Sequence, residues 1–369
     1  MNAAWLAAAV LAAVAAASGA AAQAPAQPLP IESIQLRGDR FRGLHYREMT
    51  EEQRALLYNV VNSARAVTNT TGNGPFNALL RSPTVGEQSQ QLGNAIRFSS
   101  GLSGRLRELA TLMAGRAWTS TYEWYAHERY ARDEGIDAAV IAAIAAHEKP
   151  DLAAMPAEDA MVWRVADELL YTRRITDATY REALDVLGER RLLSTVTIAA
   201  YYEYVSMLLN VDRYPLPADA PAEAAAAAHA LVPLTPGEFR REPVGTVTPR
   251  PAILNEDTRK ALEALHEALA QEASPPAEAR TTATSLVREI WSPSSARALR
   301  PPSDATSQDA ATARRFANEL LGTRFVSDQT FAAARDAFGE RGLVNLMVLV
   351  GYSNIRCAQQ ALAGAHCVL

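Results

Sequence analysis

Cysteine is almost absent from this chain of 369 residues: only Cys357 and Cys367 occur, and both lie near the C-terminus. No C-x-x-C motif exists, so the sequence offers no obvious place for a metal-thiolate site or for dithiol redox chemistry. In an oxidising compartment the two residues would close a small C-terminal loop, and the alternative is two free, partly buried thiols. Spacing alone does not decide between them, because disulfide geometry depends on the fold.

The chain also lacks an excess of basic residues. It has 36 Lys and Arg against 41 Asp and Glu, a formal net charge of −5, and no long basic run. This composition gives no electrostatic basis for binding nucleic acid. Runs of β-branched residues are few and alanine is abundant, which favours helices. We therefore predict an all-α fold with at least one large core, and the length suits two domains.

Long apolar runs are missing except at the N-terminus. The stretch from Met1 to Ala17 resembles the hydrophobic core of a secretory signal, and Ala20-Ala21-Ala22 offers a small-residue cleavage site. No Lys or Arg precedes this run, so a membrane anchor and an alanine-rich disordered leader are the alternatives. We predict a signal peptide over residues 1–22 and a secreted or periplasmic protein. We expect no stable membrane span after cleavage, because we identify no later stretch with the roughly 18 apolar residues that a span needs.

Helical periodicity dominates the rest of the chain. Thr50 and Gln53 form a capping-box pattern at the start of a helix that extends to residue 66. Further helices are predicted over residues 84–99, 105–135 (as two segments), 158–171, 177–187 and 191–210. The last of these is apolar on nearly all sides, so we expect it to be buried.

Residues 219–251 are rich in Pro and Ala and have no sustained period, which indicates a linker between two domains. His229 and His266 lie in or just beyond this linker without companions. A metal site needs several converging donors, so we interpret both as solvated residues and expect no metal.

The sequence after the linker repeats the sequence before it at one constant separation. The matches are Glu168-Leu169-Leu170 with Glu319-Leu320-Leu321, Ile175-Thr176-Asp177 with Val326-Ser327-Asp328, Leu187-Gly188-Glu189-Arg190 with Phe338-Gly339-Glu340-Arg341, and Tyr201 with Tyr352. The interpretation is a tandem duplication, with one domain over residues 36–218 and a degenerate second copy over residues 252–369. Chance similarity between alanine-rich helices is the alternative. Upstream of residue 300 the match is lost.

One stretch, residues 105–135, gathers titratable and aromatic side chains. Ser120, Glu123 and His127 fall within roughly 60° of one another on a helix, and Glu108 lies on the helix before. No such arrangement occurs in the second copy. The second copy is therefore expected to be structural, covering the first as an intrachain pseudo-dimer; a homo-oligomer is the alternative.

The spacing of these four residues resembles a family motif. Glu108, Ser120, Glu123 and His127 follow the pattern E-x11-C-x2-C-x3-H of the alkyl hydroperoxidase D proteins, within the carboxymuconolactone decarboxylase superfamily. Supporting segments are GPFNALLRSP at 74–83, RLRELATL at 105–112 and EWYAHERYARDEG at 123–135. The resemblance implies an AhpD-like helical bundle. Ser120 and Glu123 stand where the peroxidases carry redox cysteines, so thiol-disulfide peroxidase activity is disfavoured. The cysteine-free branch, which decarboxylates carboxymuconolactone, is more similar.

This resemblance implies cofactor-free and metal-free acid-base catalysis, by a decarboxylase or isomerase, on a small carboxylated or lactone-type molecule. A neutral His127 near its ordinary pKa would give or take the proton, with Glu108 and Glu123 setting its charge state. Arg116 would anchor a carboxylate, and Ser120 and Trp124 would contact the substrate.

Each of these residues also has a purely structural interpretation. Ser120 and Glu123 match a capping box, Glu108 and Arg116 suit salt bridges, and the aromatic residues suit a core. The alternative function is a catalytically silent, secreted binding or assembly module with the same fold.

Overall fold

A computed structural model describes residues 30–62, 72–253, 255–292 and 307–369 of the chain. Over these ranges the protein consists of thirteen α-helices and two short 3-10 helices, and its only β-type pairing is an isolated bridge between Gln35 and His45. The predicted all-α fold is confirmed. The predicted signal peptide, residues 1–22, lies outside the described residues.

The first nine α-helices belong to the part of the chain before residue 230. They are α1 (Glu51–Asn62), α2 (Phe76–Leu79), α3 (Pro83–Phe98), α4 (Gly104–Ala117), α5 (Thr121–Asp133), α6 (Ala138–Ala145), α7 (Ala157–Thr172), α8 (Asp177–Asp212) and α9 (Ala222–His229). The others are α10 (Glu256–Gln271), α11 (Ala277–Ile290), α12 (Gln308–Thr323) and α13 (Asp328–Leu362). The 3-10 helices are η1 (Ile31–Ser33) and η2 (Tyr46–Glu48).

Local sequence signals determine where several helices begin or bend. The Gln53 amide donates to Thr50 Oγ1 at 3.3 Å, and the Thr50 amide donates to Gln53 Oε1 at 2.9 Å, so the predicted capping box starts α1. Gly188 divides the two helices that the sequence predicts within α8, with φ 73° and ψ 166° at the bend. Only glycine adopts these angles without strain, which explains the break at that position.

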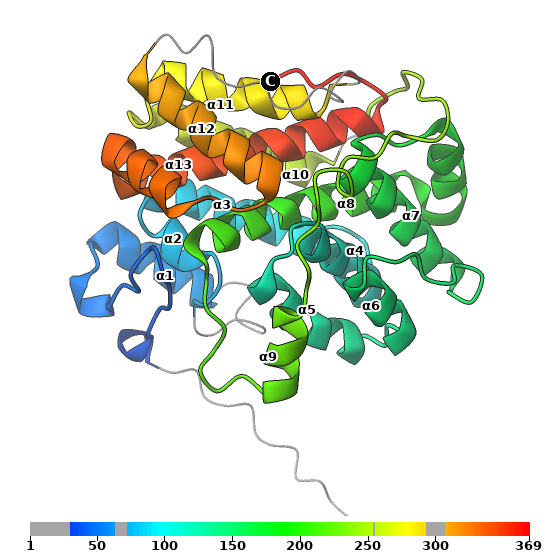
Figure 1. Cartoon of the computed structure of the whole chain (residues 1–369), viewed down its shortest axis with the longest axis horizontal. Coiled ribbons are helices and arrows are strands. Elements are labelled where there is room, and N and C mark those ends of the chain that lie inside the picture. The colour runs from blue at the N-terminus through cyan, green and yellow to red at the C-terminus, as the bar shows by residue number, and fades with distance from the viewer. Residues whose placement is uncertain (1–29, 63–71, 254, 293–306) are drawn as a thin grey trace, which may run out of the picture.

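The core is organised around α8 and α13. Both helices carry buried side chains on all sides after their bends, and they pack against each other. Helices α4 and α7 pack against α8, while α11 and α12 pack against α13. Figure 1 shows α10 to α13 stacked on one side of the molecule and α4 to α7 on the other. Helix α8 has the length and composition of a membrane span, contrary to our expectation of no such stretch, but its apolar window is fully buried inside the protein.

The two halves correspond helix by helix. Helices α7 and α12 begin at Ala157 and Gln308, and α8 and α13 begin at Asp177 and Asp328, so both pairs have the separation seen in the sequence repeat. Contrary to the sequence analysis, the match resumes further upstream. There α3 pairs with α10 and α4 pairs with α11, at a larger separation that is again the same for both pairs. The difference arises between α4 and α7, where the first half has a longer segment that contains α5 and α6.

The segment predicted as a linker has regular structure and packs on the first half. It contains α9, which contacts α5, and it buries the Phe239 side chain completely. The Arg241 amide donates to the carbonyl of Tyr171 at 2.6 Å. His229, at the end of α9, and His266, on α10, are both exposed.

Candidate functional site

Helices α4 and α5 form the corner on which the polar residues lie. The Ser103 hydroxyl accepts from the Leu106 amide and starts α4. Thr119 has a positive φ of 46° and lets the chain reverse between the two helices. Because α4 and α5 then pack side by side, Glu108 on α4 meets His127 on α5.

His127 lies between two carboxylates. Its Nδ1 is 2.5 Å from Glu108 Oε2, and its Nε2 is 3.1 Å from Glu123 Oε1. All three side chains are buried, with exposed fractions of 8% for His127, 2% for Glu108 and 3% for Glu123. The structure therefore brings together the three residues that the sequence marks as catalytic candidates, although their catalytic role stays a prediction.

Two arginines surround the far side of Glu108. Arg97, on α3, places Nη2 at 3.2 Å from Glu108 Oε1, and Arg107 Nε is 3.6 Å from the same oxygen. Burial alone would raise the pKa of Glu108, but His127 and the two arginines outweigh it and lower that pKa to about 2. Glu108 is a fixed anion at any physiological pH.

The two carboxylates change the charge state of His127. Burial alone would lower its pKa, but Glu108 and Glu123 outweigh this effect and raise the pKa to about 9. At neutral pH His127 is an imidazolium with a carboxylate at each ring nitrogen, and it has no free lone pair. The sequence analysis started from a neutral imidazole near its ordinary pKa, with Glu108 and Glu123 setting its charge state, and the direction of this pKa shift agrees with that effect of the two carboxylates.

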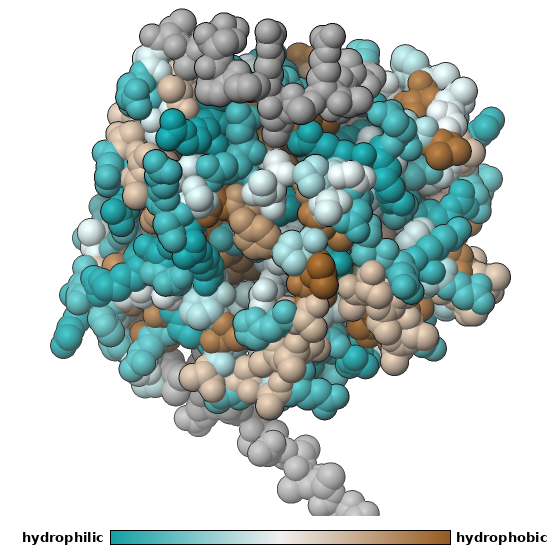
Figure 2. All heavy atoms as spheres, viewed as in Figure 1, coloured by the Kyte–Doolittle hydropathy of each residue, from teal (hydrophilic) through white to brown (hydrophobic). Residues whose placement is uncertain are grey.

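A cavity of about 900 Å³ opens over this cluster. Its buried floor includes His127, Glu123, Arg97 and Tyr202, and α5 supplies one wall. The opposite side includes Arg37 from the N-terminal segment and residues between positions 217 and 227, several of them alanine or proline. The alanine side chains of α9 form a pale-brown patch on an otherwise largely hydrophilic face in Figure 2. The segment that joins the two halves thus also forms part of the cavity wall.

The three residues predicted to bind substrate lie outside this cavity lining. Arg116 is 3% exposed and donates from Nε to the carbonyl of Ala145, at the end of α6, at 2.8 Å. Trp124 is buried and donates to Glu128 Oε2 at 3.1 Å. We correct these predictions: Arg116 satisfies a helix C-terminus, and Trp124 belongs to the core.

Ser120 is fully buried at the N-cap position of α5, and its hydroxyl makes no capping hydrogen bond. The capping box that competed with a functional role is therefore not formed. Glu123 instead directs its carboxylate towards His127. Ser120 also does not line the cavity, so substrate contact by its side chain is not supported.

The cationic residues of the cavity were not predicted from the sequence, whereas the aromatic residues Tyr122 and Tyr125 were predicted to line a pocket or to pack in the core. Arg37, Arg97, Arg129 and Arg132 line the cavity, together with the rings of residues 122, 125, 130 and 202. Arg37 is half-buried, with its guanidinium 5.9 Å from the Tyr122 ring centre. These residues come from separate segments, so no spacing pattern links them. For Arg97, the sequence offered one signal: an arginine in the last turn of the helix before the one that carries Glu108.

Comparison with known protein families bears on the part of the chain that carries this site. Residues 83–168 match the model of the carboxymuconolactone decarboxylase family. Over these residues, which are less than half of the chain, the protein is similar to the carboxymuconolactone decarboxylase family. The matched segment extends from the start of α3 into α7, so the carboxymuconolactone decarboxylase segment contains Arg97, Glu108, Glu123 and His127. No curated protein matches the chain significantly.

The family assignment agrees with the AhpD-like, all-α fold. Within the carboxymuconolactone decarboxylase segment, Ser120 and Glu123 occupy the positions at which the peroxidase motif has cysteines, and neither supplies a thiol. The match ends before α8, whose Tyr202 completes the cavity floor.

Proposed function

We propose that this protein is a carboxymuconolactone decarboxylase-like enzyme that performs cofactor-free acid-base chemistry on a small carboxylated or lactone-type molecule, as a decarboxylase or isomerase. The observation that carries the proposal is a buried imidazolium between two carboxylates at the floor of a cavity of about 900 Å³. A strongly perturbed pKa in a cavity is a typical property of catalytic groups.

The charges around the cavity support an anionic substrate. Arg37 and Arg97 both line the cavity, Arg37 beside the ring of Tyr122 and Arg97 beside the ring of Tyr202. A guanidinium binds a carboxylate through two parallel hydrogen bonds, and an aromatic ring packs against a flat ring system. A small, flat molecule with a carboxylate suits both features.

The proton held by the buried cluster supports a reaction that ends with protonation at carbon. When a carboxylate leaves as carbon dioxide, the carbon-carbon bond breaks and its electron pair stays on the substrate as an enolate. A new carbon-hydrogen bond then needs one proton, and the cluster holds one on His127 at neutral pH. Glu108, with its pKa near 2, stays ionised, so the proton remains on the imidazole until it is transferred in the reaction.

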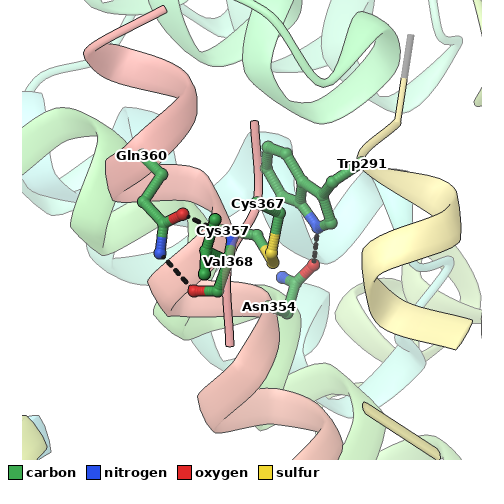
Figure 3. The surroundings of a disulfide bond; sticks show 6 residues. All are labelled: Trp291, Asn354, Cys357, Gln360, Cys367 and Val368. Carbon is green, nitrogen blue, oxygen red and sulfur yellow. Dashed lines mark hydrogen bonds between the residues drawn. A yellow bond between two sulfur atoms is a disulfide. The ribbon is translucent and has the colours of Figure 1, made fainter. Parts of the chain in front are cut away.

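A thiol peroxidase is disfavoured by the state and position of the cysteines. Cys357 and Cys367 form a disulfide between α13 and the C-terminal tail, beside Trp291 and Asn354 (Figure 3). Cys357 is 1% exposed, and neither cysteine lines the cavity over His127. The disulfide supports our proposal of export to an oxidising compartment, such as the periplasm or the extracellular space.

Proton exchange measured by NMR tests the proposed function. We would incubate the protein in D₂O with carboxylated γ-lactones and small unsaturated dicarboxylates, and follow loss of substrate and deuterium incorporation at carbon by ¹H NMR. Turnover is expected with the unchanged protein and should fall about 100-fold or more in His127→Gln. His266→Gln, at an exposed histidine of α10, is the matched control and should keep full activity.

Two outcomes would contradict the proposal. Full turnover by His127→Gln would remove His127 from the chemistry. Binding of these compounds without any turnover by the unchanged protein would favour the silent binding module instead.

A further inference from the structure

We propose that Glu123, rather than His127, is the group that exchanges protons directly with the substrate, and that His127 is the relay behind it. The inference rests on the proposed acid-base function and assigns the reacting atom within that site. It follows from the contacts of the two carboxylates, one at each ring nitrogen of His127.

Both ring nitrogens of His127 face a carboxylate oxygen. Nδ1 is hydrogen-bonded to Glu108 Oε2 at 2.5 Å, and Nε2 lies 3.1 Å from Glu123 Oε1 as an ion pair. An imidazolium has only two N–H groups, so neither is left to point at a substrate. Direct protonation of a substrate by His127 would require it to leave one carboxylate, which would leave a buried charge without its partner.

The two carboxylates differ in their surroundings. Glu108 faces Arg97 and Arg107 as well as His127, is 2% exposed, and does not line the cavity. Glu123 lines the cavity, and His127 is its only ion-pair partner among the residues that the structure describes. Glu108 is therefore a fixed counter-ion. Glu123 contacts His127 and also lines the space that a substrate would fill.

The position of Glu123 in its helix contributes to this arrangement. It lies in the first turn of α5, and His127 follows one turn later, so the helix itself holds the carboxylate against Nε2. On the facing helix, a Cβ added to Gly115 would lie 3.5 Å from Glu123 Cγ. A side chain larger than alanine at that position would displace Glu123, so Gly115 leaves the room that the carboxylate occupies.

The proton transfer balances without a further reactant. As the enolate forms, the Nε2–H bond of His127 breaks and an O–H bond forms on Glu123. That O–H bond then breaks as the new carbon-hydrogen bond forms on the substrate, and Glu123 returns to a carboxylate. The neutral His127 regains its proton from water by way of Glu123, and the hydroxide ion that remains combines with the released carbon dioxide to give bicarbonate. In an isomerisation, Glu123 takes a proton from one carbon and returns it to another, and His127 stays charged throughout.

The test compares Glu123→Gln with His127→Gln in the same D₂O exchange assay, with carboxylated γ-lactones as the probe. Glu123→Gln is expected to lower the exchange rate about 100-fold or more, because an amide does not carry the proton. Glu123→Asp keeps a carboxylate and should recover at least tenfold of that loss, with an unchanged KM. Glu267→Gln, on an exposed position of α10, is the matched control and should behave like the unchanged protein.

A second readout separates the relay from simple structural damage. An NMR titration of the His127 ring should show a lower pKa in Glu123→Gln, because one of its two carboxylates has been neutralised. If Glu123→Gln exchanges protons normally while His127→Gln does not, this inference is wrong and the proposed function stands. If neither substitution slows exchange, or if no probe exchanges with the unchanged protein, both are wrong.

Discussion

Helices α4 and α11 end in the same way in the two halves of the molecule, but the segments after them differ. Trp118 comes directly after α4 and Trp291 directly after α11, and both are buried. Trp118 Nε1 donates to Glu203 Oε1 at 2.9 Å, and Trp291 Nε1 donates to Asn354 Oδ1 at 3.0 Å. Glu203 and Asn354 lie at matching positions of α8 and α13 in the repeat. The tryptophan of each half is therefore held by the matching position of its long central helix.

Contacts between the halves are reciprocal as well. Arg173 follows α7 and Arg324 follows α12, both with positive φ. Arg324 lies 4.3 Å from the Trp118 ring centre, and Arg173 lies 5.0 Å from the Trp291 ring centre. Each arginine covers the tryptophan of the other half, as expected for two copies related by a pseudo-twofold axis between α8 and α13. We infer a tandem duplication in which the second copy occupies the position of a dimer partner.

The duplication has kept the packing and lost the site. Between α4 and α7 the first half has residues 118–156, which include α5 with Glu123 and His127. The corresponding residues 291–307 of the second half contain neither histidine nor glutamate. The position that matches Glu108 on α11 is Thr281. The surfaces that meet at the axis must remain complementary, whereas one cavity is enough for chemistry.

At the axis, the two halves differ most clearly at one matching position, which is Glu203 in the first half and Asn354 in the second. Asn354 Nδ2 donates to Glu203 Oε2 at 2.9 Å, and Arg173 binds Glu203 through both terminal nitrogens at 2.7 and 2.8 Å. Two glutamates at these positions would bring two buried carboxylates into contact, which is strongly unfavourable. Arg324, which matches Arg173, has no ion-pair partner among the described residues of its own half, and burial lowers its pKa to about 9.

The largest expected effect comes from exchanging these two residues. Asn354→Glu and Glu203→Asn should each lower the free energy of unfolding by about 3–5 kcal/mol, by opposing two carboxylates or by leaving Arg173 unpaired. The double substitution should recover much of that loss, because Glu at position 354 would pair with Arg324 as Glu203 pairs with Arg173. Urea denaturation of the four proteins measures this coupling.

Gln329→Glu, at an exposed position of α13, is the control and should stay within about 0.5 kcal/mol of the unchanged protein. If the losses of the two single substitutions simply add in the double substitution, a glutamate at position 354 does not pair with Arg324. The two matching positions would then not be interchangeable, which would contradict the duplication.

The next effect is a pH dependence that comes from His127 in the first half. The pKa of His127 is raised to about 9 in the folded protein, so its stabilising charge is fully present below about pH 6.5, the value for an unfolded chain. The contribution, on the order of 3 kcal/mol, is lost as the pH rises through 9. Unfolding at pH 6, 7.5 and 9 should show this decline in the unchanged protein and a smaller one in His127→Gln.

His266, in the second half, provides the matched comparison. Its ring is exposed and stacks on Tyr352 rather than facing two carboxylates. The substitution His266→Gln should leave the decline between pH 6.5 and 9 unaltered. An equal decline in His127→Gln and the unchanged protein would show that the Glu108–His127–Glu123 cluster does not store this energy.

The smallest effect should be equal in the two halves. Gly188 and Gly339 bend α8 and α13 with φ values of 73° and 68°, and a Cβ at either position would meet no neighbouring atom within 4 Å. Alanine there costs only the backbone strain, about 1–3 kcal/mol. Gly188→Ala and Gly339→Ala should therefore lower the unfolding free energy by the same amount in urea denaturation. A loss confined to one of them would show that the two bends have diverged.

Side chains that lie close together in the sequence were predicted as neighbours, whereas contacts between distant segments were not predicted. Glu108, Glu123 and His127 were predicted as a group because they lie on consecutive helices and follow a spacing motif. Arg37 and the wall between Pro217 and Ala227 reach the cavity from distant segments through tertiary packing, which leaves no period in the sequence. For the same reason the size of the pKa shift at His127 was not predicted, since burial is a property of the assembled fold.

The repeat was followed correctly only where its spacing is constant. The match between α7–α8 and α12–α13 was visible as one separation, but the match between α3–α4 and α10–α11 required a larger one. The side chains at these upstream positions have diverged as well, so only the helix bounds and the buried Trp118 and Trp291 identify the pairs.

The segment with α9 has a further consequence as the covalent connection between the two halves. A dimer of separate chains dissociates on dilution, and any cavity that depends on its partner is lost with it. Here the covering half is tethered through the chain that also walls the cavity, so its effective concentration does not depend on how much protein is present. The packing of the two halves against each other is thereby independent of dilution.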